Sequence, residues 1–230
     1  MRMSAPAATV SAALASRRSV RAFLDTPVDG ALLRDILARC GRAPSGGNLQ
    51  PWRIFVVGGD DLARFKAIMA ERLRTKPSPD PMEYPIYPEK LGEPYRSYRF
   101  RIGEALYASL GIAREDKVGR LTQFTNNFRF FGAPVALFCF VDRTMGAPQW
   151  SDLGMYLQSV MLLLREHGLD SCPQEAWSTY NRVVRDFVQA PPELMLFCGM
   201  AIGYADTNAP INQFPVERMP ADEYLRFQGI

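Results

Sequence analysis

Histidine and cysteine are scarce in this chain of 230 residues. Its one histidine, His167, excludes a metal site built from several histidines, and a catalytic triad would have to use it. His167 comes directly before Gly168 at the end of a helical pattern, so we expect it in the last turn of a helix. The four cysteines form no CxxC pair and no metal-ligand spacing, which predicts buried free thiols, a reducing compartment and no metal site.

Long apolar runs and a strong excess of charge are also absent. No run reaches the length of a membrane span, and residues 1–16 are too weakly apolar for a secretion signal, so we expect a cytoplasmic protein with no membrane partner. The net charge of +3, with both signs interspersed, gives no reason to expect nucleic acid as a partner. No G-x-G-x-x-G motif occurs, which excludes a dedicated dinucleotide-binding fold.

The composition that remains is ordinary for a folded domain, with 47% apolar and 22% charged residues. No linker or repeat divides the chain, so we expect one domain over residues 1–230. Periodicity predicts helices at residues 9–16, 29–39, 60–74, 95–110, 114–131, 149–167, 180–189 and 222–227, with Asp29 capping the second and Asp60 or Asp61 the third. Apolar runs predict strands at residues 53–57, 135–141 and 194–204, of which 135–141 is apolar throughout and therefore central. Few strands among many helices indicate an α+β fold, a mixed sheet covered by helices.

Residues 75–94 contain six prolines, which exclude a regular element and predict an irregular Pro- and Tyr-rich excursion. One interpretation is a surface segment that only pads the fold. The other is a lid beside the active site, because Tyr84 and Tyr87 offer flat faces for an aromatic ligand.

A second irregular stretch joins the helix that ends near residue 41 to the strand at 53–57. Its prolines exclude a helix, its glycines allow unusual backbone dihedrals, and its short polar side chains both donate and accept hydrogen bonds. These residues are Pro44, Ser45, Gly46, Gly47, Asn48, Gln50 and Pro51. The stretch suits a flat ligand rich in hydrogen-bonding groups, or it is simply a polar connection.

Three arginines gather near the N-terminus, at Arg17, Arg18 and Arg21, with Ser19 among them. Such a cluster is either a solvated face or a site for an anion that neutralises the repelling guanidinium groups. A phosphate suits them well, because its oxygens pair bidentately with the planar fork of arginine.

Three motifs stand in order along the chain: Arg-Arg-Ser-Val-Arg-Ala-Phe at 17–23, Pro-Ser-Gly-Gly-Asn-Leu-Gln-Pro-Trp at 44–52, and Ser-Cys-Pro-Gln-Glu-Ala-Trp at 171–177. Together they resemble the nitroreductase-like family of FMN-dependent NAD(P)H oxidoreductases, over residues 14–224. In that family the third motif is a loop that contacts the flavin. The resemblance implies a mainly antiparallel central sheet and an intertwined homodimer with FMN at the interface.

The resemblance also implies a role for individual residues. Arg17, Arg18, Ser19 and Arg218 would hold the FMN phosphate, and Arg21 would lie near the pyrimidine edge of the flavin. Asn126 and Arg129 would bond the ring, although they fit an exposed helix face equally well. The backbone of Glu175 would approach flavin N5, with Ala176 where the family often has glycine. The full implied FMN-binding set is Arg17, Arg18, Ser19, Arg21, Pro44, Ser45, Gly46, Asn48, Gln50, Asn126, Arg129, Pro173, Gln174, Glu175, Ala176 and Arg218.

The implied activity is reduction of nitroaromatic, quinone or similar acceptors by NAD(P)H. No acid–base pair is evident, so the flavin would carry the chemistry through N5. Without a dinucleotide-binding motif, nicotinamide would be a transient reductant that shares one pocket with the acceptor, which predicts ping-pong kinetics. Alternatives are a dehalogenase or flavin-consuming synthase of the same fold, a flavin-binding protein without turnover, and nucleic-acid binding by the arginine cluster.

Overall fold

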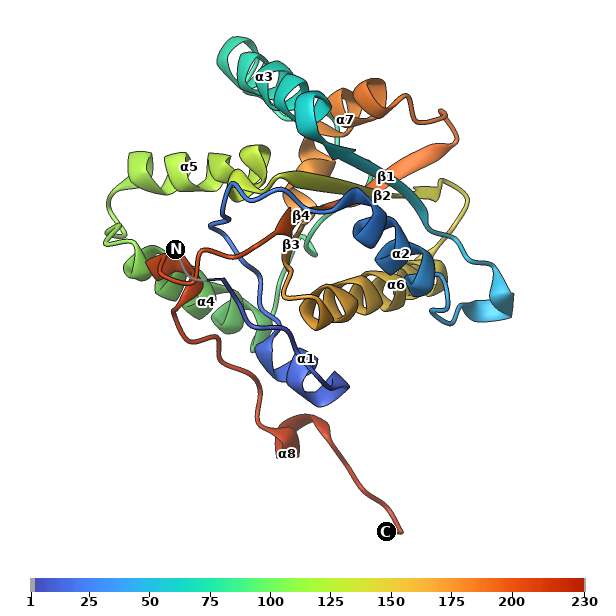
Figure 1. Cartoon of the computed structure of the whole chain (residues 1–230). Helices are drawn as coiled ribbons and strands as arrows, with labels where there is room; N and C mark the ends of the chain where they lie inside the picture. The colour runs from blue at the N-terminus through green and yellow to red at the C-terminus, as the bar shows by residue number, and fades with distance from the viewer. Residues whose placement is uncertain (1–2, 230) are drawn as a thin grey trace.

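The computed structural model describes residues 3–229. At its centre lies a four-stranded antiparallel sheet in the order β1 (Arg53–Gly58), β2 (Val135–Asp142), β4 (Leu194–Gly203) and β3 (Asp170–Gln174) (Figure 1). The apolar strand β2 is interior, as predicted. The expectation of a loop over residues 171–177 is wrong for its first half, which forms β3. An edge strand tolerates Pro173, because one side of its backbone needs no donor to the ladder.

The helices lie near their predicted positions, with two corrections. Within residues 3–229 they are α1 (Val10–Ser16), α2 (Gly30–Cys40), η1 (Gly46–Asn48), α3 (Gly59–Thr75), α4 (Tyr95–Ser109), α5 (Lys117–Thr125), η2 (Asn126–Gly132), α6 (Ala147–Glu166), η3 (Glu175–Tyr180), α7 (Asn181–Val188), η4 (Pro210–Asn212) and α8 (Ala221–Tyr224), where η marks a 3-10 helix. The N-cap of α3 is Gly58, and Asp60 and Asp61 lie instead in its first turn, where their charge suits the helix dipole. The helix predicted over 114–131 ends as α5 at Thr125 and continues as η2.

Helices cover both faces of the sheet, which explains why β2 is apolar at every position but its last. Phe138 and its alternate neighbours pack against α3, η2, η3 and α7. Leu137 and its alternate neighbours pack against α2 and α6. All four cysteines are buried and free, as predicted.

An aromatic cluster on the first face fixes the position of η2 and η3. Trp177 from η3 stacks on Phe130 from η2, with 4.6 Å between ring centroids, and meets Phe138 of β2 edge-on at 5.5 Å. Gly199 of β4 lies directly beneath the indole, where a Cβ atom would stand 2.3 Å from Trp177 Cδ1. The sheet therefore carries η2 and η3 as one packed layer.

The two ends of the chain meet the sheet differently. The N-terminal segment runs along β3, where Ser19 forms a parallel bridge with Ser171. The C-terminal tail, after residue 213, leaves the body of the molecule and carries α8 (Figure 1). At the other edge of the sheet, β1 pairs with β2 alone among the described strands. No helix within residues 3–229 combines the length and apolar character needed to cross a bilayer.

Candidate functional site

The arginine segment, residues 17–21, is built into the fold rather than left on a solvated face. The N–H of Val20 donates to Ser171 O at 3.0 Å, which attaches the segment to β3. Arg18 Nη2 donates to Phe214 O at 2.7 Å, so this guanidinium ties the segment to the start of the C-terminal tail. The side chains of Arg17, Arg18, Ser19 and Arg21 are all partly buried.

Asn212, which the sequence did not mark, holds the same segment in place. It is 5% exposed. Its Oδ1 accepts from the N–H of Arg21 at 2.8 Å, and its Nδ2 donates to Ala22 O at 2.8 Å and Asp206 O at 2.9 Å. A lone asparagine in the tail gives no local signal of this role, because both of its main partners are about 190 residues away.

Arg17 and Arg218, which the resemblance assigns to the FMN phosphate, are far apart in the sequence but lie close enough for their charges to interact. Burial lowers the pKa of Arg17, and the positive charge of Arg218 lowers it further. Cys172 of β3 lies nearby: burial raises its pKa to about 11, while the charges of Arg21 and Arg17 act in the opposite direction. Arg17 is partly buried and Arg218 is exposed, and two like charges that interact favour an anion between them.

A cavity of about 470 Å³ opens beside this segment. It contains three of the predicted residues, Arg21, Asn126 and Arg129, together with Lys66 of α3, which was not predicted. The remaining lining residues are Ala22, Phe23, Phe131 and Gly132, so the lining includes three cations and no carboxylate. The cavity is of a size typical for small-ligand sites, and its charge calls for an anionic or electron-rich ligand.

The turn in η2 is what brings Asn126 and Arg129 to the cavity. Phe130 and Phe131 both adopt left-handed backbone conformations, with φ of 53° and 54°. Asn126 and Arg129 are three residues apart, so one helical turn places their side chains on the same face, and the left-handed turn that follows ends the helix and buries Phe130 under Trp177. Two consecutive left-handed phenylalanines are costly and persist only where surrounding packing holds them.

The side chain of Gln174 is buried and bonded within the protein and does not face a ligand cavity. It is 2% exposed. Its Nε2 donates to Asn127 O at 2.8 Å, and its Oε1 accepts from Trp177 Nε1 at 3.4 Å, so the side chain ties η2 to η3. Pro173, Glu175 and Ala176 adjoin it at the junction of β3 and η3, and none of this set lines the cavity.

The second motif forms a compact exposed loop around η1. Gly47, Asn48 and Gln50 all have positive φ, between 48° and 58°. The N–H of Gln50 donates to Ser45 Oγ at 3.0 Å. The N–H of Gly46 points at both carboxylate oxygens of Asp152 on α6, each 3.3 Å away, and that carboxylate is buried. Pro44 and its neighbours through Gln50 do not line the cavity of their own chain.

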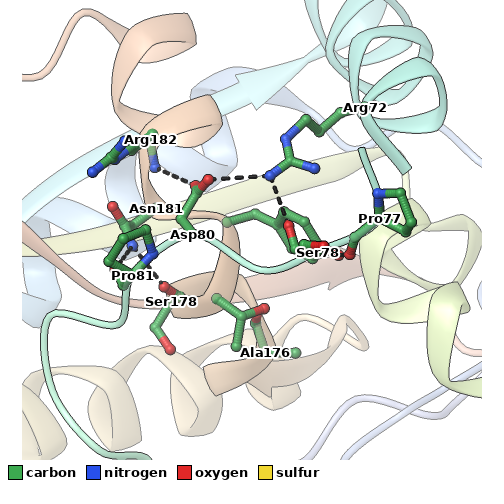
Figure 2. A network of polar contacts seen from close by, with 11 residues as sticks. Arg72, Pro77, Ser78, Asp80, Pro81, Ala176, Ser178, Asn181 and Arg182 are labelled. Carbon is green, nitrogen blue, oxygen red and sulfur yellow. Dashed lines mark hydrogen bonds and ion pairs between the residues drawn. The ribbon is translucent and has the colours of Figure 1, made fainter. Parts of the chain in front are cut away.

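The first half of the proline-rich segment is fixed to the body of the protein by a polar network (Figure 2). Asp80 lies at its centre: its carboxylate accepts from Arg72 Nη2 and from the N–H of Arg182, each at 3.1 Å. Asn181 Nδ2 donates to Pro81 O at 3.1 Å. The network spans α3, the segment and α7, so these prolines form an ordered strap.

The two tyrosines of that segment have different surroundings. Tyr84 packs between Trp150 and Phe197, and its hydroxyl donates to Phe197 O. That carbonyl is available because Phe197 is an extra residue in β4, where the register with β2 shifts. Tyr87 is 47% exposed, with the Arg99 guanidinium 4.1 Å from its ring centroid. Of the two tyrosines predicted to face an aromatic ligand, Tyr84 is therefore occupied by packing within the protein, and Tyr87 has an exposed ring.

The chain is similar over nearly its whole length to proteins of known activity. It is 54% identical to the FMN and NADPH-dependent nitroreductase NfnB of Sphigopyxis sp. strain HMH, whose crystal structure superposes with a TM-score of 0.92 and covers 96% of this chain and 100% of that one. NfnB of Mycobacterium smegmatis, solved in complex with NADPH, is 32% identical with a TM-score of 0.88, over 95% of this chain and 98% of that one. The nitrobenzene nitroreductase of Ectopseudomonas oleovorans is 38% identical over 92% of this chain and 93% of its own.

A family model agrees with these likenesses. The model described as the nitroreductase family matches residues 14–204, which include the arginine segment, the η1 loop, η2 and β3. The resemblance inferred from three short motifs therefore extends to the whole fold. The chain belongs to the nitroreductase family.

Proposed function

We propose that this protein is an FMN-dependent oxidoreductase that uses NAD(P)H to reduce nitroaromatic compounds. Family membership and relatives that are nitroreductases at 36–54% identity support the activity. The observation that carries the proposal is the cavity lined by three cations and no carboxylate, to which the partly buried arginine segment contributes Arg21. NADPH is the favoured reductant, because two of the similar solved proteins are described with it.

The residues present fit a terminal phosphate. The partly buried Arg17 and the exposed Arg218 repel one another, and Arg18 and Ser19 follow Arg17 on a backbone fixed to β3. We assign these four residues to the FMN phosphate. Arg18 contributes by anchoring the segment through Phe214 O as well as by its charge. This arrangement favours FMN over FAD, in which the phosphate is not terminal.

The cavity fits the polar end of a flavin ring. Asn126 offers an amide with both donor and acceptor, and Arg21 and Arg129 supply positive charge. When bound, FMN supplies the group that accepts a hydride from the nicotinamide and passes it to the acceptor. This chain's own residues hold and orient the cofactor, and their charge favours its electron-rich form. We assign Pro173, Gln174, Glu175 and Ala176 to the ring through their backbone, since the Gln174 side chain is already bonded.

We further propose that residues 1–230 work as one FMN-binding domain within an intertwined homodimer. The η1 loop, with Pro44, Ser45, Gly46, Asn48 and Gln50, stands away from its own cavity and would reach the flavin of the second copy. An open groove of about 1100 Å³ runs beside the unpaired edge of β1, lined by apolar residues such as Leu37, Ile54 and Val56. We assign this groove to the C-terminal tail of the partner.

Four buried free thiols support a reducing, cytoplasmic location.

Cofactor analysis followed by anaerobic kinetics tests the proposed function. Purified protein is expected to release FMN, and not FAD, on denaturation. NADPH should bleach the bound flavin without oxygen, and 4-nitrobenzoate or nitrobenzene should restore the colour. Initial rates against both substrates should give parallel double-reciprocal lines, since one pocket serves both in turn. A protein that binds flavin but is never bleached by NADPH or NADH would be a binder, and the proposal of an enzyme would fail.

A further inference from the structure

Lys66 occupies a place that none of the three motifs marks. It lies on α3 beside the core residue Phe65, but its side chain runs toward the end of the sheet instead of into the core. Its Nζ donates to Ala133 O at 2.9 Å, at the junction of η2 and β2. Lys66 of α3 lines the cavity together with Arg21 of the arginine segment and Asn126 and Arg129 of η2.

The ammonium group of Lys66 is incompletely paired. A lysine has three N–H donors, and Ala133 O is its one hydrogen-bond partner within residues 3–229. Burial lowers the pKa of Lys66, and the Asp25 carboxylate opposes that shift. Lys66 lines both the cavity and the neighbouring groove beside β1, and Asp25 lines the groove, where its carboxylate acts on Lys66 through its charge and not as a hydrogen-bond partner of Nζ. A half-buried cation with spare donors on a cavity without carboxylates is positioned for a ligand that carries negative charge.

We propose that Lys66 is a third cation at the pyrimidine edge of bound FMN, where it stabilises the reduced flavin more than the oxidised one. This inference rests on the proposed function. Two-electron reduction adds negative charge to that edge of the ring, so a nearby cation binds the reduced form more tightly and raises the reduction potential. The hydrogen bond to Ala133 O fixes Nζ at the boundary between the groove, which Ala133 lines, and the cavity, which Lys66 also lines.

The test compares the reduction potential of bound FMN in matched variants. Lys66→Met keeps the length of the side chain and removes the charge, and Lys66→Gln is a second neutral variant. Lys66→Arg restores a cation. Lys76→Met, at the exposed end of the same helix, is the control for loss of a lysine elsewhere. Potentials are measured anaerobically against a reference dye, and the affinity for oxidised FMN is measured by titration of apoprotein.

Both neutral variants are expected to weaken binding of reduced FMN relative to oxidised FMN by about tenfold, which corresponds to a fall of about 30 mV for a two-electron couple. Lys66→Arg and Lys76→Met should keep the wild-type potential. If Lys66 only braces α3 against Ala133, the neutral variants will lose stability and bind both redox forms less well, while the potential stays the same. That result would overturn the inference. A wild-type protein that binds no FMN would instead overturn the proposed function.

Discussion

At the scale of single residues, the charge of Arg17 is the sharpest feature of the proposed phosphate site. Burial lowers the pKa of Arg17 and the charge of Arg218 lowers it further, so a phosphate would offset both effects as well as accept hydrogen bonds. We predict that Arg17→Ala weakens FMN binding at least tenfold, since one charge-assisted hydrogen bond is worth about 1.5–3 kcal/mol. Titration of apoprotein with FMN measures this.

Arg74→Ala is the matched control for the loss of an arginine. Arg74 is exposed at the end of α3 and pairs with Glu71, so its removal should leave FMN affinity unchanged. An Arg17→Ala protein that binds FMN as well as the wild type would remove Arg17 from the site.

A site residue could be predicted from the sequence only where it belongs to a short motif of neighbouring residues. Arg21, Asn126 and Arg129 stand in or near short motifs, and the structure brings all three to one cavity. Lys66 and Asn212 carry no local signal. Lys66 is one polar residue on an amphipathic helix, and Asn212 acts on residues about 190 positions earlier. Gln174 was in the right motif, but its side chain serves packing between η2 and η3.

At the scale of elements, η3 depends on a glycine in the strand below it. A methyl group at position 199 would meet the buried indole of Trp177 at 2.3 Å, and that ring is held between Phe130 and Phe138. We predict that Gly199→Ala destabilises the protein by about 1–3 kcal/mol, as overpacking of a tight core does. Urea unfolding followed by tryptophan fluorescence measures the change.

The control for this glycine lies on α6. A methyl group at position 154 would meet no described heavy atom within 4 Å outside its own helical turn, so Gly154→Ala should stabilise the helix by about 0.5–1 kcal/mol. Equal effects from both substitutions would show that the contact with Trp177 is not what matters.

The proline-rich segment divides into an anchored part and an open part. Tyr84 is partly buried and packs against the core beside Trp150, whereas Tyr87 is exposed under Arg99. We predict that Tyr87→Ala shifts the ratios of kcat/KM among nitroaromatic acceptors by about 1–2 kcal/mol, because it removes a stacking face. Tyr84→Ala should instead lower stability by about 2–4 kcal/mol and affect all acceptors alike, because it leaves a cavity in the core.

Both variants should keep one FMN per chain, since neither tyrosine lines the proposed flavin cavity. A Tyr87→Ala enzyme with unchanged ratios among acceptors would mean that the whole segment only supports the fold.

The boundaries of helices and strands, like the site residues, could be predicted only where neighbouring residues mark them. The α-helices and the three long apolar strands were predicted, because hydrophobic periodicity and helix-breaking residues mark them in the sequence. The end of α5 was not, because the sequence of η2 is compatible with a helix. The left-handed turn at Phe130 is imposed by the aromatic cluster around Trp177, which forms only in the complete fold.

At the scale of the whole molecule, the C-terminal tail carries apolar side chains that its own chain does not cover. Tyr224 and Phe227 are 62% and 72% exposed. We predict that the protein is a dimer of 25.8 kDa chains, and that Leu225→Asp with Phe227→Asp converts it to monomers, since charges would then enter an apolar groove. Light scattering after gel filtration measures the mass.

The monomers should also bind FMN more weakly, because the η1 loop of the second copy would be missing. Lys90→Asp, in the exposed part of the proline-rich segment, is a control for an added acidic residue. A wild-type protein that is monomeric at micromolar concentration and still holds FMN would contradict the shared site.

The arginine segment depends on partners nearly a whole chain length away. The hydrogen bonds of Arg18 and Arg21 span 196 and 191 residues. During synthesis Arg18 and Arg21 leave the ribosome about 190 residues before their partners Phe214 and Asn212. A nascent chain therefore has no finished anion site, however much of its sheet has already formed. Each newly made molecule therefore completes the proposed phosphate site only after Asn212 and Phe214 have emerged, and FMN is expected to bind after that point and not during earlier synthesis.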